Sequence, residues 1–306
     1  MIISEIFDIK YPFFQGGMAQ VATGAFAASV SEAGAMGIIG SGAMDEHALT
    51  EEIKKAKDIT DKPFGVNLML MNPRADKMAE IIGDMGVSLV TTGAGNPGKY
   101  VKMWKDAGVR IFPVVSSVAL AKRLESLGVD GLIAEGSESG GHIGELTTMV
   151  LLPLVAEAVN IPVVAAGGIA TGKQVLAAEI LGASGVQMGT LFLGSEECPI
   201  HENYKKSILN ARDRSTIVTG RISGAPVRVL KNQMAQEYLR REQAGADMME
   251  LEKYTLGALR KAVKDGDVKH GSLMAGQSVA FVNEVKPVKE MLVSIMKEYE
   301  KAKEKI

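Results

Sequence analysis

Two apolar segments that each end in glycine carry the clearest chemical signal in this chain. Ile161–Gly168 and Gly185–Thr190 both have the near-continuous apolar composition of a buried parallel strand. A glycine at a strand end leaves backbone N–H groups uncovered, and such groups bind anions. We therefore predict a phosphate site of the kind found after strands seven and eight of a (β/α)8 barrel. Its residues are Gly167, Gly168, Gly189 and Thr190.

One histidine is the best candidate for proton chemistry. His142 lies in the glycine-rich segment from Glu135 to Gly144, which can bring a side chain close to a ligand. Histidine is the usual proton donor or acceptor near neutral pH, so we predict that His142 is catalytic. The alternative is that the glycines form a tight turn and His142 only hydrogen-bonds to the backbone.

Further polar residues lie where other apolar segments end. Asn67 and Glu135 end two of these segments, and Gln15 and Met18 end or follow a third. Because the carboxyl ends of parallel strands meet at one mouth of a barrel, we expect these residues to converge. Asn67 suits a heterocycle such as a flavin ring, and Glu135 suits a hydroxylated chain. The alternatives are a strand-end turn at Asn67 and a rim ion pair at Glu135.

Composition excludes several classes of function. The 306 residues carry a net charge of −2, which gives no reason to expect nucleic acid or a membrane as a partner. The single cysteine, Cys198, excludes an internal disulfide and suits the reducing cytoplasm. The N-terminal residues lack the pattern of a secretory signal. No cluster has the spacing of metal ligands, so we expect no metal and solvated positions for His47, His201 and His270.

Eight apolar runs are spaced as the strands of a barrel. A Gly-Val step opens a run at Gly65, Gly86, Gly108, Gly128 and Gly185. We interpret each glycine as the left-handed residue that ends a helix and each valine as the start of a strand. Eight strands that alternate with helices indicate an α/β fold closed into a TIM (β/α)8 barrel. The predicted strands are 11–15, 36–40, 66–70, 87–92, 109–115, 130–135, 161–166 and 186–189.

The segment Gly93–Gly98 has the form Gly-x-Gly-x-x-Gly, which is typical of dinucleotide-binding loops. The acidic residue that such a loop requires downstream is replaced here by the apolar segment Pro113–Val115. We therefore interpret Gly93–Gly98 as a loop at the barrel rim that can contact a ligand.

The regular spacing stops after the eighth run. Residues 196–270 are polar and rich in charge, and 251–263 has apolar residues at helical spacing. We predict a smaller, mostly helical, lid-like domain over 196–270, inserted into a barrel formed by 1–195 and 271–306. The last helix of the barrel is predicted at 287–305. An insertion at this point lies on the catalytic rim.

Several motifs resemble those of the flavin-dependent nitronate monooxygenase superfamily. They are Gln15–Ala19, Phe64–Asn67, Thr91–Gly95, Glu135–His142, Ala165–Ile169 and Gln187–Thr190. Within that superfamily, Ala134–Met149 and Gly271–Gln277 look most similar to the FMN-dependent enoyl-acyl carrier protein reductase of bacterial fatty-acid synthesis. The resemblance extends over nearly the whole chain, including the insertion.

The resemblance implies one non-covalent FMN, NADH or NADPH as co-substrate, an enoyl thioester on an acyl carrier protein as acceptor, and a homodimer. It also implies a response to monovalent cations, for which no motif is visible. His142 would be a donor to the thioester oxygen, a proton source or a group that orients the flavin. The implied cofactor-binding residues are Gly17, Met18, Ala19, Asn67, Glu135, Ser139, Gly140, Ala166, Gly167, Gly168, Gln187, Met188, Gly189, Thr190, Met274, Gly276 and Gln277.

A carrier protein is acidic, so a basic surface beside the mouth would favour its docking. The alternative is a solvated face that nearby acids balance. The candidate residues are Lys205, Lys206, Arg212, Arg214, Arg221, Arg228 and Lys231.

Three other functions fit parts of the sequence. A nitronate monooxygenase would use the same FMN and an equivalent histidine, with oxygen as the electron acceptor. An isomerase or aldolase acting on a phosphorylated metabolite would use the glycine rim without a flavin. A flavin-binding protein without turnover would use the flavin alone.

Overall fold

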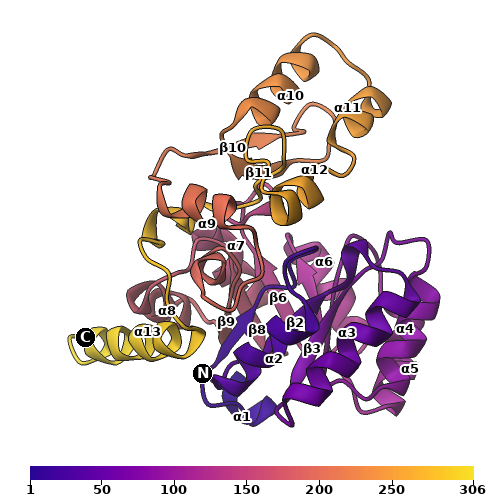
Figure 1. Ribbon diagram of the computed structural model, residues 1–306. Helices are drawn as coiled ribbons and strands as arrows, with labels where there is room; N and C mark the ends of the chain where they lie inside the picture. The colour runs from indigo at the N-terminus through magenta and orange to yellow at the C-terminus, as the bar shows by residue number, and fades with distance from the viewer.

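Eight parallel strands form the centre of the computed structural model, which describes residues 1–306 (Figure 1). Hydrogen bonding runs in the order β1-β9-β8-β6-β5-β4-β3-β2. A parallel bridge between Phe14 and Met36 joins β1 to the segment that leads into β2, so the sheet closes into the predicted TIM barrel. The strands are β1 (Phe13–Gln15), β2 (Gly37–Gly40), β3 (Phe64–Met69), β4 (Leu89–Gly93), β5 (Arg110–Val115), β6 (Leu132–Glu135), β8 (Val163–Ala166) and β9 (Gly185–Met188).

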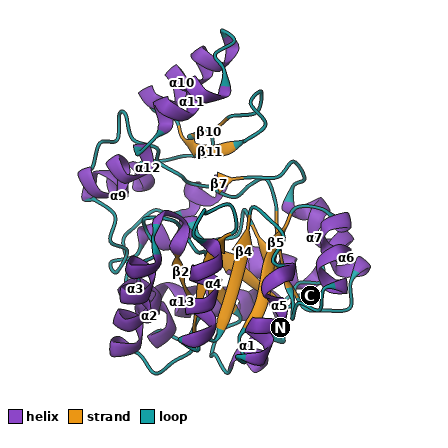
Figure 2. Ribbon diagram, turned by 90° about the vertical axis from the view of Figure 1, so that its right-hand side faces the viewer, coloured by secondary structure: helices purple, strands orange, loops and turns teal.

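Helices surround this sheet and connect its strands (Figure 2). The closing helix α13, predicted at 287–305, spans Val288–Lys303 and packs against α8, where the Tyr299 hydroxyl donates to Glu179 at 2.7 Å. No helix is long and apolar enough to cross a membrane. The barrel helices are α1 (Ile3–Phe7), α2 (Gly24–Glu32), α3 (Glu46–Ile59), α4 (Ala75–Asp84), α5 (Gly98–Asp106), α6 (Val118–Ser126), α7 (Thr148–Ala158), α8 (Gly172–Ile180) and α13.

Alternation along the strands divides the apolar residues into two clusters. Phe14, Ile38, Phe112, Ile133 and Val164 point inward and fill the barrel, as expected of a packed core rather than a pore. Their neighbours along the strands pack instead against the helices. This alternation fixes which residue at each strand end faces the mouth.

Three of the five Gly-Val steps have the predicted conformation. Gly86, Gly108 and Gly128 have φ of +59°, +76° and +82° and each follows a helix. Gly65 and Gly185 instead lie inside β3 and β9, so the interpretation of those two as helix ends is wrong. Both are glycine because of crowding: a Cβ on Gly185 would lie 2.7 Å from the Ile3 side chain.

The insertion stands above the mouth of the barrel, on the side away from the N-terminus (Figure 1). It contains helices but also a β-hairpin, which was not predicted from the sequence. The helix predicted over 251–263 is interrupted at Gly257, which is left-handed with φ +73°. The boundaries of the insertion as a domain stay a prediction. Its elements are α9 (Glu202–Leu209), β10 (Thr216–Thr219), β11 (Val227–Leu230), α10 (Gln233–Gln243), α11 (Met248–Thr255), α12 (Ala258–Arg260) and a π-helical turn (Lys261–Asp265).

A third strand completes the hairpin, and it comes from the barrel. β7 (Gly141–His142) belongs to the loop after β6 and pairs with β11, so that His142 aligns with Val227 and Gly141 with Arg228. The Ile143 N–H extends the ladder by donating to the Pro226 carbonyl at 3.1 Å. β7 thus lies between the barrel and the hairpin (Figure 2), and the insertion holds the histidine loop.

Candidate active site

The glycine rim after β8 and β9 offers uncovered backbone donors. Gly167 and Gly168 have φ of +94° and +77°, and a Cβ on Gly167 would lie 2.8 Å from the Gly136 carbonyl oxygen. The N–H groups of Gly167, Gly168 and Gly189 donate no hydrogen bond within the protein. Adjacent free N–H groups without a side chain in front of them form the kind of site that binds phosphate.

Thr190 connects this rim to the segment that returns from the insertion. Its Oγ1 accepts from the Gly276 N–H at 2.8 Å, and its own hydroxyl proton remains free to donate. The Gln277 N–H donates to the Glu138 carbonyl at 2.8 Å. A Cβ on Gly140 would lie 2.7 Å from the Gly276 nitrogen, so these two glycines allow two backbone segments to meet.

Four predicted residues face the mouth from the ends of four strands. Asn67 of β3, Glu135 of β6, Ala166 of β8 and Gln187 of β9 alternate with neighbours that pack against the helices. The Asn67 amide is oriented: its Oδ1 accepts from the Thr91 hydroxyl at 2.9 Å, and its Nδ2 approaches the Gly17 carbonyl at 3.4 Å. The structure therefore brings these side chains together at the mouth.

Glu135 and Ser139 are polar groups that the protein itself leaves unsatisfied. Burial raises the pKa of Glu135 to about 7, because a charged carboxylate loses hydration there. The nearby Ser139 hydroxyl opposes this rise in pKa, but it does not reach hydrogen-bond geometry and is buried without any partner. Together with the uncovered N–H groups of the rim, these atoms fit a ligand that carries a phosphate at one end and a polar ring at the other.

His142 is exposed on β7, not in an irregular loop as expected. Protein atoms around its ring displace hydrating water and lower the pKa of His142 below its ordinary value, and no charged or hydrogen-bonding neighbour contributes to that shift. The imidazole is therefore neutral at neutral pH, with one N–H to donate and one nitrogen to accept.

The other predicted residues do not place a polar side chain at the mouth. A Cβ on Gly17 would lie 2.3 Å from the Asn67 Cβ, and Met18 lies against Gly189. Ala19, next in the same loop, is half-buried. Met188 is 1 % exposed and packs between strands and helices, so its side chain does not face the mouth. Met274 pairs with Val229 in the ladder beside β11.

The expectation that Gln15 joins the mouth is wrong. Gln15 lies within β1, is fully buried and uses its Oε1 to accept from the Ile38 N–H at 3.1 Å. Its neighbour Phe14 occupies the inward position, so alternation turns Gln15 into the wall between β1 and β2. Strand alternation could have indicated this position, because side chains of successive residues point to opposite faces and an inward Phe14 therefore excludes an inward Gln15.

The remaining titratable candidates lie outside the mouth. Cys198 is buried, which raises the pKa of its thiol to about 11 and makes it unreactive. His201 accepts from the Asn203 N–H at the start of α9, and His270 pairs with Asp267. No group of three or more His, Cys, Asp or Glu side chains is placed to hold a metal ion.

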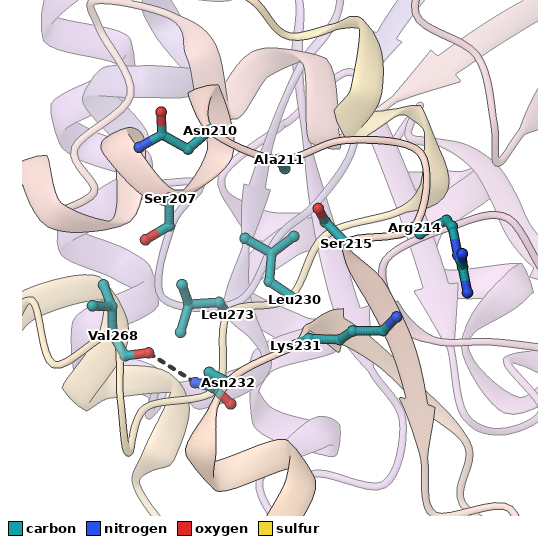
Figure 3. Close-up of a pocket in the computed structure, with 10 residues that line it drawn as sticks. All are labelled: Ser207, Asn210, Ala211, Arg214, Ser215, Leu230, Lys231, Asn232, Val268 and Leu273. Atoms are coloured by element: carbon teal, nitrogen blue, oxygen red, sulfur yellow. Dashed lines mark hydrogen bonds between the residues drawn. The ribbon is translucent and has the colours of Figure 1, made fainter.

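The seven basic residues proposed for docking do not form one surface. Lys205 and Arg228 are buried, and Arg221 pairs with Glu145 at 2.8 Å. The exposed remainder is Lys206, Arg212, Arg214 and Lys231. Arg214 and Lys231 line a cavity of about 300 Å³ together with Ser207, Ser215 and the apolar Leu230 and Leu273 (Figure 3).

Comparison with known proteins identifies the family. A family model described as nitronate monooxygenase matches residues 1–85 and 72–298. The chain belongs to the nitronate monooxygenase family. Members of this family are FMN-dependent oxidoreductases, which agrees with the phosphate-compatible rim and the unsatisfied polar atoms of the mouth.

Similar proteins within the family carry more than one name. A solved structure of FabK from Thermotoga maritima is 46 % identical, with a TM-score of 0.96, and the match covers 99 % of this chain and 97 % of that one. A probable nitronate monooxygenase of Staphylococcus saprophyticus is 32 % identical over 92 % of both chains. A (3aS,4S,5R,7aS)-5-hydroxy-7a-methyl-1-oxo-octahydro-1H-indene-4-carboxyl-CoA dehydrogenase of Mycobacterium tuberculosis is 34 % identical over 77 % of this chain and 67 % of its own.

Proposed function

We propose that this protein is an FMN-dependent enoyl-acyl carrier protein reductase that uses NADH or NADPH. The observation that carries the proposal is the likeness to FabK, which extends over the insertion as well as the barrel. The relative named as a CoA-ester dehydrogenase adds support, because it shows that the family includes an oxidoreductase named for a thioester.

FMN, when bound, accepts a hydride from a reduced nicotinamide and delivers it to an electron-poor alkene. Its phosphate would lie on Gly167, Gly168, Gly189 and Thr190, where the free N–H groups are. Its ring would meet Asn67, which Thr91 holds in place, and the unpartnered Ser139 hydroxyl.

His142 is assigned the role of hydrogen-bond donor to the thioester oxygen. Negative charge develops on that oxygen as the double bond is reduced, and a donor placed there stabilises the transition state. Its lowered pKa keeps the imidazole neutral, so one ring nitrogen carries a proton that can be donated without a net charge at the mouth. The pairing of β7 with β11 fixes the face of the sheet on which the His142 side chain lies.

Glu135 has a pKa of about 7, so it holds a proton in a substantial fraction of molecules at neutral pH. A protonated carboxyl donates a hydrogen bond and an ionised one only accepts. We assign Glu135 to ligand binding rather than proton transfer, since it faces the mouth beside the orphan hydroxyl of Ser139.

The proposed partner is an acidic acyl carrier protein. Arg214 and Lys231 line the cavity of Figure 3 without forming an ion pair, and exposed Lys206 and Arg212 lie on the same insertion. Leu230 and Leu273 of that cavity are neighbours of Val229 and Met274, which form the ladder beside the histidine strand. A carrier docked there would have its prosthetic arm close to the mouth. The homodimer and the monovalent-cation response stay predictions.

The test is anaerobic oxidation of NADH and NADPH by the FMN-saturated protein, with and without crotonyl-acyl carrier protein. Acceptor-dependent oxidation is expected, and the two nucleotides give the cofactor preference directly. Oxygen-dependent turnover of an alkyl nitronate, without any response to the enoyl thioester, would replace the proposal with the activity that the Staphylococcus relative is named for.

A further inference from the structure

Arg228 is a buried cation without an acidic partner. It lies on β11, is 8 % exposed, and makes all its hydrogen bonds to neutral oxygens. Its Nε and Nη2 donate to the Ser137 carbonyl at 3.2 and 2.9 Å, and its Nη1 donates to the Thr216 hydroxyl at 3.3 Å. By contrast, Arg240 and Arg241 on the same insertion both pair with Glu237 at 2.8 Å.

The positive charge of Arg228 is not neutralised by its surroundings. Burial and the like charge of nearby Arg221 lower its pKa, and only Glu138 acts in the opposite sense. The Glu138 carboxylate is engaged elsewhere, because it accepts from the Thr148 N–H at 2.9 Å and from the Thr148 hydroxyl at 3.0 Å. A guanidinium has five N–H donors, of which Arg228 uses three. A buried charge in this state is costly unless a counter-charge arrives.

Arg228 also contacts the loop that follows β6. Its backbone aligns with Gly141, and the next residue along β11 toward the N-terminus, Val227, aligns with His142. The carbonyl it holds, that of Ser137, belongs to the loop between Glu135 and Ser139. Because side chains alternate along β11, the Arg228 side chain lies on the face of the sheet opposite to that of Val227 and His142, so an anion bound to Arg228 would lie beside the loop from Glu135 to Ser139.

Arg221 can join such a site. Buried Glu242 accepts from the N–H groups of Gly220, Ile222 and Ser223 and so fixes the backbone on both sides of Arg221. The side chain of Arg221 is 49 % exposed and pairs with Glu145, which is 71 % exposed. Exposed ion pairs contribute little free energy, so Arg221 can exchange Glu145 for a better acceptor.

We propose that Arg228 and Arg221 form an anion site that binds a phosphate group of an incoming substrate. Guanidinium groups bind phosphate through paired, charge-assisted hydrogen bonds. The proposal rests on the proposed function for the source of that phosphate: the diphosphate of the nicotinamide nucleotide, or the phosphodiester of the pantetheine arm. This site is separate from the glycine rim that would hold the phosphate of FMN.

Calorimetric titration of the FMN-saturated protein with inorganic pyrophosphate tests binding directly, because FMN already fills the glycine rim. Replacing Arg228→Gln is expected to weaken pyrophosphate binding by at least about tenfold, as for other hydrogen bonds to charged groups. Arg221→Gln is expected to weaken it by about threefold. Arg240→Gln, which alters a paired cation of the same insertion, is expected to change nothing. Unchanged binding in folded Arg228→Gln overturns the proposal.

Arg221→Gln decides the matter if thermal unfolding shows that Arg228→Gln does not fold. Arg221 is exposed, so its replacement leaves the fold intact, and pyrophosphate binding as tight as in the parent protein would then overturn the site.

Kinetics distinguish the two sources of phosphate. For Arg228→Gln, a raised KM for NADH with unchanged KM for 1-benzyl-1,4-dihydronicotinamide, which lacks phosphate, identifies the nucleotide as the source of the bound phosphate. A raised KM for crotonyl-CoA with unchanged KM for the crotonyl thioester of N-acetylcysteamine, which lacks phosphate, identifies the pantetheine arm as the source. An equal rise in KM for substrates with and without phosphate means that Arg228 only positions the Ser137 loop, which refutes the proposal. A parent protein that reduces no enoyl thioester refutes the proposed function instead, and the pyrophosphate titration still decides the anion site.

Discussion

The glycine rim and the three-stranded sheet build the same mouth in opposite ways. The rim consists of Gly167, Gly168 and Gly189, which lie at the ends of β8 and β9, two adjacent strands of the barrel. The sheet joins β7 to β10 and β11, whose residues lie far along the chain from His142. The rim presents backbone, whereas the sheet presents side chains, with His142 on one face and Arg228 on the other.

This difference separates cofactor binding from chemistry. A site made of backbone N–H groups is fixed once the barrel folds, and a side chain added at Gly167 or Gly168 would strain it because both have positive φ. A site made by pairing a barrel loop with an insertion depends on both parts being in register. We therefore expect rim substitutions to remove FMN, and sheet substitutions to lower turnover while FMN stays bound.

The largest effect is expected from Gly168→Val, at the centre of the rim. Gly168 has φ +77°, and an added Cβ would lie 3.2 Å from the Glu138 side chain, so the variant must distort the rim as well as cover its N–H groups. FMN affinity should fall by at least about 100-fold, since several charge-assisted hydrogen bonds are lost together. Fluorescence titration with FMN measures this fall.

Gly86→Ala is the matched control for Gly168→Val. Gly86 has φ +59° with nothing within 4 Å of an added Cβ, so it introduces left-handed strain away from the mouth. It should cost about 1 kcal/mol of stability and leave FMN affinity unchanged. Stoichiometric FMN in purified Gly168→Val would show that the phosphate lies elsewhere.

His142→Ala is expected to have the next largest effect, and only on chemistry. Loss of one donor at a developing oxyanion lowers kcat by about 100-fold. FMN affinity should not change, because the rim is untouched. Stopped-flow measurement of the enoyl-dependent reoxidation of the reduced protein isolates this step, and His47→Ala, an exposed histidine, serves as control. Full turnover in FMN-loaded His142→Ala would remove the residue from the mechanism.

The ends of the barrel strands could be predicted from the sequence and the three-stranded sheet could not, for a physical reason. Each barrel strand is marked locally by an apolar run and its neighbouring turn, so the ends of β8 and β9 were found without knowing their partners. The hairpin could in principle have been predicted, because Thr216–Thr219 and Val227–Leu230 are short runs that contain β-branched residues and flank Gly220 and Gly224. The pairing of this hairpin with Gly141–His142 could not be predicted, since a segment of two residues is too short to indicate which strand it pairs with.

Arg228 shows the same limit for charge. In sequence it is one of the seven basic residues proposed for docking, and an exposed surface was the natural expectation. Only the ladder between β11 and β7 buries it and turns its guanidinium toward the Ser137 carbonyl.

Glu135 stands where the two regions meet, and its pKa gives a third prediction. The folded-state pKa is raised to about 7, so between pH 4.5 and 7 the folded protein keeps a proton that the unfolded chain releases. The FMN-free protein should therefore lose about 2 kcal/mol of unfolding free energy as the pH rises from 5 to 8, with no further loss from this group above that range. In Glu135→Gln this part of the pH dependence should vanish, as urea unfolding at both pH values would show. An identical pH dependence in the two proteins would mean that Glu135 ionises freely in the fold.

Gly141→Ala gives the smallest expected effect and the most direct test of the comparison. Gly141 has φ +77° like Gly168, but an added Cβ would lie 3.5 Å from the Met274 sulfur, which is ordinary contact. The substitution therefore strains the backbone of β7 without filling the mouth, and it should turn the adjacent His142 away from its direction. We expect kcat to fall by about tenfold and FMN affinity to stay the same, because only the sheet is disturbed. If FMN were lost together with turnover, the rim and the sheet would be one cooperative unit, and cofactor binding could not be assigned to the rim alone.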